Sequence, residues 1–237
     1  HFGEKGFDYL GNSRDDLAIW GAARHAIVVN PEQGVESRAK ALGNVEQVVR
    51  SNVSTLRDWR KALRMHQWMK NALIFVPLLA AHQLGQPQQL LNGVLAFLFF
   101  GLCASSVYVL NDLLDLADDR HHATKRKRPF ACGKLSIKAG LVIVPVLLIA
   151  AFSGAALLLP WQFCGVLAAY YLLTLAYSLS LKRQMVTDVI VLAMLYTARI
   201  LAGAAAFNLP LTFWILAFSM FMFLSLALVK RYAELRE

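Results

Sequence analysis

The segment LVIVPVLLIAAFSGAALLLPWQFCGVLAAYYLLTLAYSLSL, residues 141–181, contains no Asp, Glu, Lys or Arg. The segment NALIFVPLLAAHQLGQPQQLLNGVLAFLFFGLCASSVYVLN, residues 71–111, is equally free of charge. About 20 consecutive apolar residues are enough for one helical crossing of a bilayer. Because both runs exceed that length, they predict a membrane protein built from transmembrane helices.

The composition of the whole chain supports this interpretation. Of its 237 residues, 57% are hydrophobic and 16% are charged, whereas soluble domains average about 45–50% apolar and about 25% charged residues. An ordinary cytosolic globular domain and a disordered chain are therefore excluded. The three cysteines, Cys103, Cys132 and Cys164, are too few and too scattered for a disulfide framework or a zinc site.

Hydropathy predicts an all-α membrane protein, a multi-span helical bundle with six spans. We expect these spans near residues 66–84, 89–111, 137–159, 161–181, 186–207 and 211–229. A basic amphipathic helix over residues 55–65 precedes them and suits an anionic membrane face.

The positive charge is concentrated on alternate connections between the spans. Nearly all Lys and Arg lie in the pre-span helix, the loop 112–138, Lys182-Arg183 and the tail 230–237. The positive-inside rule then places the N-terminus, this loop and the C-terminus in the cytoplasm, at a bacterial-type plasma membrane. The net charge of +9 is explained by this asymmetry, and no nucleic-acid-binding motif accompanies it.

The N-terminal residues differ from the rest of the chain. A short strand at 7–10, a turn at 11–16, a helix at 17–24 and a strand at 26–30 predict a β-turn-α-β fragment. Such a fragment is too small to bury a core alone, so residues 1–32 are expected to be the tail of a larger soluble domain. Residues 33–54 are interpreted as a polar linker, and 55–237 as the membrane domain.

The strongest chemical signal is the segment NDLLDLADDR, residues 111–120. Asp112, Asp115 and Asp119 are spaced i, i+3 and i+7, which predicts three carboxylates on one helix face at the membrane interface. A divalent cation would relieve their repulsion, and Mg²⁺ prefers a few carboxylates with water and phosphate oxygens. The alternative is a solvated acidic cap at the end of a span.

The next residues are cationic. Lys125, Arg126, Lys127 and Arg128 are consecutive and offer the donors that a diphosphate requires. The alternative is a membrane anchor of the positive-inside kind. His121 and His122 are interpreted as loop residues that contact phosphate or solvent, and metal ligation by the pair is the alternative.

Two charges lie near or within later spans. Asp188 begins the fifth span, and Arg199 lies eleven residues further on a similar face. An ionisable residue inside a membrane span is a functional candidate, although a structural ion pair with Asp188 would also explain Arg199. Tyr177, Lys182, Lys70 and Asn71 are expected at the same cytoplasmic side; Arg64, His66, Gln67 and Trp68 are interpreted as candidate interface anchors.

Together these residues resemble the UbiA-type prenyltransferase superfamily, which consists of all-helical membrane enzymes. The string Asn111-Asp112-x-x-Asp115-x-x-x-Asp119 is similar to its first aspartate-rich motif. Within the superfamily, the sequence most resembles the decaprenyl-phosphate phosphoribosyltransferases of arabinan synthesis, which serve cell wall biosynthesis. This similarity rests on HQWMKN (66–71), DRHHATKRKRPFACG (119–133), YSLSLK (177–182) and the segment 188–204 with Asp188, Arg199, Gly203 and Ala204.

The resemblance implies an Mg²⁺-dependent membrane transferase that releases diphosphate. Asp112, Asp115 and Asp119 would be the catalytic and metal-binding residues. The implied reaction is phosphoribosyl transfer from phosphoribosyl diphosphate to polyprenyl phosphate; the alternative is prenyl transfer from polyprenyl diphosphate to an aromatic acceptor. The implied substrate-binding residues are Asn111, Lys70, Asn71, Arg120, His122, Lys125, Arg126, Arg128, Tyr177, Lys182, Asp188 and Arg199.

The chain also departs from that superfamily. Its members usually have about nine spans, so six suggest a truncated domain. Their second acidic motif follows span six, where this chain has KRYAELRE, residues 230–237. Either Glu234 and Glu237 replace that motif, or it lies beyond residue 237.

Residues 1–31 resemble the end of a haloacid dehalogenase-like domain. Gly11-Asn12-Ser13-x-x-Asp16 is similar to its last acidic loop, which helps to bind Mg²⁺, and a simple turn is the alternative. The nucleophilic aspartates of that family would lie upstream, so we expect no phosphatase activity.

A membrane transporter or a lipid-binding scaffold is the alternative from another functional class. Transporters usually place their charged site near the bilayer midplane, whereas the charges here gather at one membrane surface. Metal-dependent release of diphosphate would identify an enzyme.

Overall fold

The computed structural model describes residues 3–49, 54–181 and 185–234. The chain divides into two compact units, residues 1–54 and 55–237. Each unit has its own buried core and is described by itself.

The N-terminal unit is a small α/β structure. Its elements are β1 (Asp8–Gly11), α1 (Asp16–Ala22), β2 (His25–Val29), α2 (Val35–Ala41) and β3 (Val45–Val49). The three strands are parallel in the order β1-β2-β3. Both helices contribute to a core formed by Trp20, Ala26, Val28, Val35 and Ala39.

This unit corrects the expected β-turn-α-β fragment and the expected linker at 33–54. The segment after β2 continues with α2 and β3, so the sheet has three strands. The sequence signal of β3 is weak because none of its five side chains is fully buried and its second and third residues, Glu46 and Gln47, are polar and exposed. The relation to a haloacid dehalogenase-like domain stays a prediction.

Asp16 fastens the loop between β1 and α1. Its Oδ2 accepts hydrogen bonds from the backbone N–H groups of Ser13 (2.8 Å) and Asn12 (2.7 Å), and its Oδ1 accepts one from the Tyr9 hydroxyl. These donors, the Ser13 and Asn12 amides above all, hold the pKa of Asp16 below its usual value. A Cβ on Gly11 would lie 2.5 Å from the Asp16 carboxyl group. The contacts give Asp16 a structural role in a turn.

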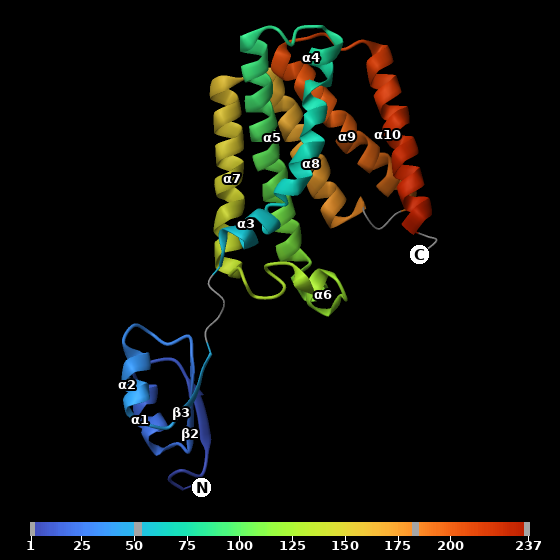
Figure 1. The fold of residues 1–237 in the computed structure, drawn as a ribbon. Coiled ribbons are helices and arrows are strands. Elements are labelled where there is room, and N and C mark those ends of the chain that lie inside the picture. Colours follow the sequence, from blue (N-terminus) through green and yellow to red (C-terminus); the bar gives the residue numbers. More distant parts are fainter. Residues whose placement is uncertain (1–2, 50–53, 182–184, 235–237) are drawn as a thin grey trace. The chain divides into compact units, whose positions relative to one another are not determined.

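The second unit is a helical bundle (Figure 1). Its elements are α3 (Leu56–Ala62), η1 (Met65–Phe75), α4 (Val76–Ala80), α5 (Pro87–Leu114), α6 (Leu116–His121), η2 (Lys125–Lys127), α7 (Ile137–Leu158), α8 (Trp161–Leu179), α9 (Met185–Phe207) and α10 (Phe213–Glu234). Among the described residues, five helices (α5 and α7 to α10) are long and apolar enough to span a membrane.

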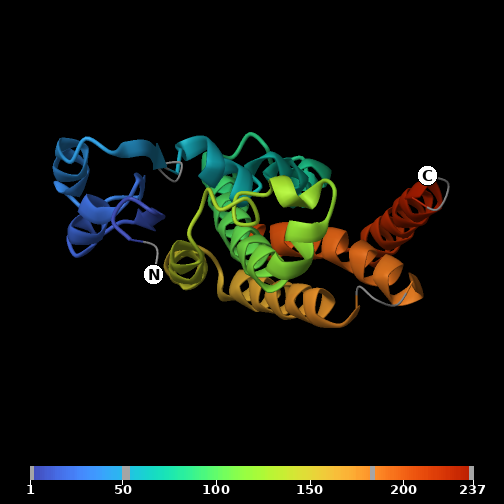
Figure 2. The same cartoon turned by 90° about the horizontal axis from the view of Figure 1, so that it is seen from below.

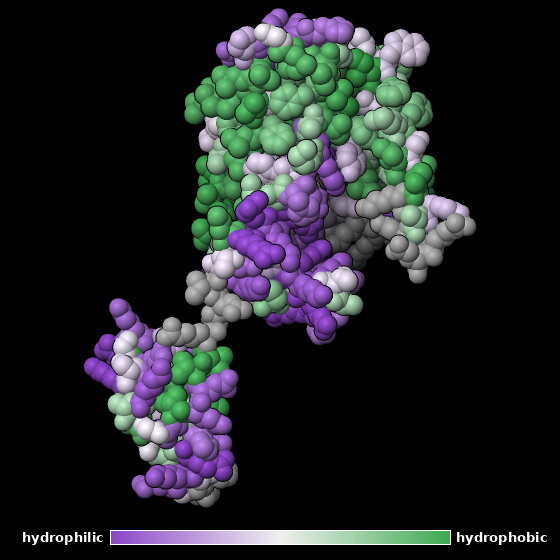
Figure 3. All heavy atoms as spheres, viewed as in Figure 1, coloured by the Kyte–Doolittle hydropathy of each residue, from purple (hydrophilic) through white to green (hydrophobic). Residues whose placement is uncertain are grey.

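The spans differ in how much of their surface the protein covers. The apolar windows of α5 and α9 are 61% buried, whereas those of α7, α8 and α10 are 18–22% buried. Helices α5 and α9 are therefore central, and α7 and α10 lie on opposite sides of the bundle (Figure 2). The outer surface is a hydrophobic band, with hydrophilic side chains gathered at the end that carries α3 and α6 (Figure 3). An apolar band of this kind suits the bilayer core.

The expected first span, 66–84, is not a single α-helix. Residues 65–75 form the 3₁₀-helix η1, and a short α4 with Pro77 in its first turn follows. At about 2.0 Å per residue, an 11-residue 3₁₀-helix is about 22 Å long, so η1 and α4 together run along the bundle beside α5 (Figure 1). The six expected spans are thus corrected to five long helices and this 3₁₀-α segment. Helix α5 also begins at Pro87, two residues before the expected second span.

Close packing of α9 against η1 depends on Gly203. A Cβ at this position would lie 2.0 Å from the backbone oxygen of Ile74, far inside van der Waals contact. Glycine is therefore required for the approach of the two elements.

Gly203→Ala is expected to destabilise the folded protein by about 1–3 kcal/mol, because the added methyl group pushes η1 away from α9. The measurement is thermal unfolding in detergent. Gly165→Ala is the matched control, since a Cβ there meets no atom within 4 Å. Equal unfolding temperatures for the two variants would contradict this account.

Candidate active site

The start of η1 brings three polar residues to one cavity. With three residues per turn, Gln67 and Lys70 lie in one row of the 3₁₀-helix, and both line the cavity together with Arg64. Arg64 precedes η1 in the left-handed conformation, with φ +48°, which is uncommon for a residue with a side chain. Asn71 and Ile74 lie in another row and are buried.

We call this cavity the inner cavity. Its volume is about 380 Å³, within the usual range for a small-molecule site. The helices η1, α5, α8 and α9 and the segment around η2 form its walls. Its lining residues are Arg64, Gln67, Lys70, Val107, Tyr108, Asn111, Asp115, Lys125, Arg128, Tyr170, Thr174, Tyr177, Ser178, Leu192, Leu195, Tyr196 and Arg199.

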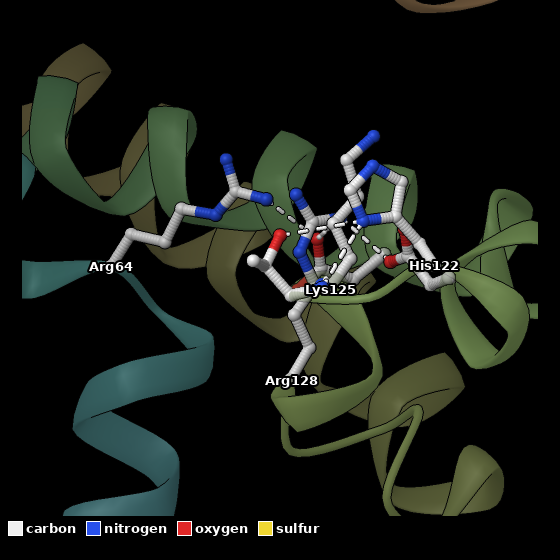
Figure 4. Close-up of polar contacts among 7 residues, drawn as sticks. Arg64, His122, Lys125 and Arg128 are labelled. Atoms are coloured by element: carbon white, nitrogen blue, oxygen red, sulfur yellow. Dashed lines mark hydrogen bonds and ion pairs between the residues drawn. The ribbon is translucent and has the colours of Figure 1, made fainter.

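Beside this cavity, Asp112 contacts two segments that lie far apart in the sequence. Arg64 donates a hydrogen bond of 2.6 Å to Oδ1 of Asp112, and Arg128 donates one of 3.2 Å to the same atom. Arg128 also donates to Oδ2 of Asp119 at 2.6 Å. Figure 4 shows Arg64 and Arg128 reaching toward this place from different segments, with Lys125 and His122 nearby. Both carboxylates are almost fully buried and are compensated by the two arginines.

The three aspartates do not lie on one continuous helix. Helix α5 ends at Leu114, Asp115 lies between helices with φ −88° and ψ 11°, and Asp119 belongs to α6. This break turns Asp115 into the inner cavity, while Asp112 and Asp119 contact arginines. In the part of the chain that the structure describes, no three His, Cys, Asp or Glu side chains are grouped to hold a metal ion. The expected placement on one face of a single helix is therefore wrong, whereas the metal-binding role of the three aspartates stays a prediction.

The residues nevertheless fit Mg²⁺ in another binding mode. Mg²⁺ is commonly held by one or two carboxylates together with water and substrate phosphates. The Asp115 carboxylate and the Asn111 amide both line the inner cavity, among cationic side chains. This donor set suits an ion that is shared with a phosphorylated substrate, and not a cage made of protein ligands alone.

Arg199 supplies a cation deep in the bundle. Its side chain is buried, with Nε 3.1 Å from Oδ1 of Asn71 and Nη1 2.5 Å from the backbone oxygen of Leu195. The guanidinium lies 5.4 Å from the ring centroids of Phe100, Tyr170 and Tyr196. Among the described residues, no carboxylate forms an ion pair with it. A buried cation without a counter-ion is costly, so the position favours binding of an anion.

Asp188 is engaged elsewhere. It is fully buried, accepts a hydrogen bond of 2.7 Å from the Tyr177 hydroxyl, and forms an ion pair with Arg231 of α10. The alternative of an Asp188–Arg199 pair is therefore not what the fold contains. Through Tyr177, Asp188 supports the wall of the inner cavity without lining it.

The structure sorts the other expected site residues by position. The inner cavity includes Lys70, Asn111, Asp115, Lys125, Arg128, Tyr177 and Arg199. Asn71 contacts it through Arg199. Arg120, His122 and Arg126 are exposed and line neither this cavity nor the one next to it; His122 accepts a hydrogen bond from the Thr124 N–H (3.3 Å). Lys182 and Glu237 lie outside the described residues, as does the side chain of Glu234.

Several lining residues were not singled out from the sequence. On α8, Tyr170, Thr174 and Ser178 were missed; together with the predicted Tyr177 they are spaced i, i+4, i+7 and i+8, so the four residues form a polar stripe in an apolar helix. That spacing could have identified them. From the sequence, Arg64 and Gln67 are interpreted as candidate interface anchors, because hydropathy shows neither the left-handed backbone of Arg64 nor the 3₁₀-helix over residues 65–75.

The sequence of the chain is similar to those of several known proteins. Nodulation protein NoeC of Azorhizobium caulinodans is 44% identical over 179 residues, 75% of this chain and 57% of that protein. Decaprenyl-phosphate phosphoribosyltransferase of Mycobacterium tuberculosis is 38% identical over 179 residues, 74% of this chain and 59% of that protein. An uncharacterized protein, y4nM, of Sinorhizobium fredii is 42% identical over 97% of this chain, hence over both units, and 45% of that protein. The chain thus spans about half the length of these relatives.

Solved structures share the fold of the membrane unit. A UbiA homolog from Archaeoglobus fulgidus bound to DMAPP and Mg²⁺ superposes with a TM-score of 0.61 at 18% identity, over 71% of this chain and 61% of that one. The same homolog bound to GPP and Mg²⁺ gives a TM-score of 0.58 at 19% identity, over 71% and 60%. The UbiA prenyltransferase family matches the sequence over residues 72–237. The chain therefore belongs to the UbiA prenyltransferase family.

Proposed function

We propose that the protein is an Mg²⁺-dependent membrane transferase that moves a phosphoribosyl group from phosphoribosyl diphosphate to a polyprenyl phosphate. The observation that carries the proposal is the charge of the inner cavity. Arg64, Lys70, Lys125, Arg128 and Arg199 line it together with Asp115. The mycobacterial relative named for this activity supports the substrate pair.

The charge balance favours this substrate pair over the alternative. Two phosphorylated substrates bring more negative charge into the cavity than one prenyl diphosphate and an aromatic acceptor. Lys70 Nζ lies 5.7 Å from the Tyr196 ring centroid and the Arg199 guanidinium lies 5.4 Å from it. The Tyr196 ring thus already has two cations near it, and these cations would repel an allylic cation at the same place. Prenyl transfer to an aromatic acceptor remains the second candidate, because the solved homolog binds prenyl diphosphates with Mg²⁺.

The proposed reaction is a substitution at the anomeric carbon. An oxygen of the polyprenyl phosphate attacks C1 of the ribose, and the bond from C1 to the diphosphate oxygen breaks with its electron pair on diphosphate. The attacking phosphate is already ionised, so the chain needs no strong base. Mg²⁺, when bound, would neutralise charge on the leaving diphosphate.

The chain's own residues hold the anions in place. Asn111 and Asp115 would hold the ion, and Arg128 and Lys125 would bind the diphosphate. Arg199 and Lys70, which share the Tyr196 ring, would bind the second phosphate. The lipid tail would lie along the apolar spans, and the cation-rich end of the bundle would face the cytoplasm, as the positive-inside rule requires.

The testing experiment uses membranes from cells that express the full-length natural protein, supplied with Mg²⁺. One sample receives labelled phosphoribosyl diphosphate and polyprenyl phosphate; another receives labelled polyprenyl diphosphate and 4-hydroxybenzoate. Label that moves from the sugar into the lipid phase supports the proposal. Label that moves onto the aromatic ring supports prenyl transfer, and no Mg²⁺-dependent release of diphosphate would favour a transporter or a scaffold.

A further inference from the structure

A second cavity lies against the inner one. Its volume is about 460 Å³, and it shares Arg64, Gln67, Lys125 and Arg128 with the inner cavity. We call it the outer cavity. It also includes Lys61 of α3, His66, Thr124 and Lys127, none of which lines the inner cavity. The two cavities therefore share a cationic wall, and each has space for a chemical group of its own.

The outer cavity is a defined structure and not a loose charged surface. Its two sides, α3 with the start of η1 and the segment 124–129, are joined where Asp112 accepts hydrogen bonds from Arg64 and Arg128. The same two segments also meet where the Trp59 and Phe130 rings pack edge to face, with centroids 6.5 Å apart. Lys134 forms an ion pair of 3.6 Å with Asp58, whose pKa lies below its usual value because the Thr55 side chain donates to it.

The charge of the outer cavity is strongly unbalanced. Lys61, Arg64, Lys125, Lys127 and Arg128 line it, and Asp112 is the single carboxylate among its lining residues in the described part of the chain. Arg64 and Arg128 both contact Asp112, whereas Lys61, Lys125 and Lys127 form no ion pair with any described residue. The Lys side chains and the Thr124 hydroxyl are donors that a phosphate group accepts from.

We propose that the outer cavity binds a phosphate monoester, separate from the diphosphate in the inner cavity. This inference rests on the proposed function, because that reaction brings together one diphosphate and two monoester phosphates. The monoester is either the 5-phosphate of the sugar donor or the headgroup of the lipid acceptor. Simultaneous occupation of adjacent chambers would orient the donor and the acceptor.

The test measures binding to the purified full-length protein in detergent, so that it does not depend on turnover. The probes are ribose 5-phosphate, a short-chain polyprenyl phosphate and inorganic diphosphate with Mg²⁺. The variant is Lys61→Ala combined with Lys127→Ala, since these side chains line the outer cavity alone. The matched control is Arg60→Ala combined with Lys138→Ala, which removes the same charge from exposed positions that line neither cavity.

The Lys61/Lys127 variant is expected to bind one of the two monophosphates about 10-fold or more weakly than the wild type. Its affinity for inorganic diphosphate should not change, and the control should match the wild type with every probe. Weaker binding of ribose 5-phosphate assigns the cavity to the sugar donor; weaker binding of the polyprenyl phosphate assigns it to the lipid.

Two results would overturn the inference. One is equal monophosphate binding by the wild type and the Lys61/Lys127 variant. The other is equal weakening in the variant and the control, which would indicate surface charge alone. A protein that binds a monophosphate through Lys61 and Lys127 but transfers no ribosyl group would refute the proposed reaction and leave the site intact.

Discussion

Asp115→Asn is expected to lower turnover about 10³-fold while the protein still inserts into membranes and folds. Asp115 lines the inner cavity together with Asn111, and it is the carboxylate of the acidic motif that lines this cavity. Metal-assisted charge neutralisation is worth several kcal/mol in the transition state, and each 1.36 kcal/mol is tenfold in rate. The measurement is the rate of diphosphate release at increasing Mg²⁺ concentration.

Asp118→Asn is the matched control for this substitution. Asp118 is three residues away, exposed, and lines neither cavity, so the same loss of charge there should leave turnover unchanged. Higher Mg²⁺ should restore part of the activity of Asp115→Asn, because the weakened site still has the Asn111 oxygen and the substrate phosphates. Full activity of Asp115→Asn at low Mg²⁺ would remove the metal role from this residue.

The membrane bundle could be predicted from the sequence, but the geometry of its acidic motif could not. Charge-free runs of about 40 residues reveal spans regardless of packing detail, and five of the expected six correspond to the long helices α5, α7, α8, α9 and α10. The i, i+3, i+7 spacing of Asp112, Asp115 and Asp119 predicts one continuous helix through the motif. In the structure, α5 ends at Leu114 and α6 begins at Leu116, and Asp112 and Asp119 form buried ion pairs with Arg64 and Arg128. Those partners lie 48 and 9 residues away.

The 3₁₀-helix was also beyond sequence reasoning. By hydropathy, residues 66–84 are apolar enough for a span. Hydropathy does not distinguish an α-helix from a 3₁₀-helix. The choice depends on tertiary contacts, including the close approach of Gly203 to Ile74 and the Trp68 indole, which donates to the Ser105 hydroxyl at 3.0 Å. The shared row of Gln67 and Lys70 follows from that choice.

Arg199→Met should separate a functional role of this buried cation from a structural one. If Arg199 existed to stabilise the bundle, its removal would leave the Asn71 amide without its donor and lower the unfolding temperature. If Arg199 is held there for an anionic substrate, its burial is a cost to the fold, and an apolar side chain of similar length relieves that cost. The unfolding temperature of the substrate-free protein is therefore expected to stay the same or to rise.

Activity should change in the opposite direction. Loss of one buried donor to substrate charge typically costs about 10²- to 10³-fold, and we expect that reduction in kcat/KM for phosphoribosyl transfer. Arg199→Lys keeps the charge but not the fork that bonds Asn71 and Leu195 together, so it should retain an intermediate activity. A stable Arg199→Met variant with wild-type kcat/KM would show that no substrate anion reaches this residue. An unstable but active variant would make Arg199 a structural element that links η1, α8 and α9.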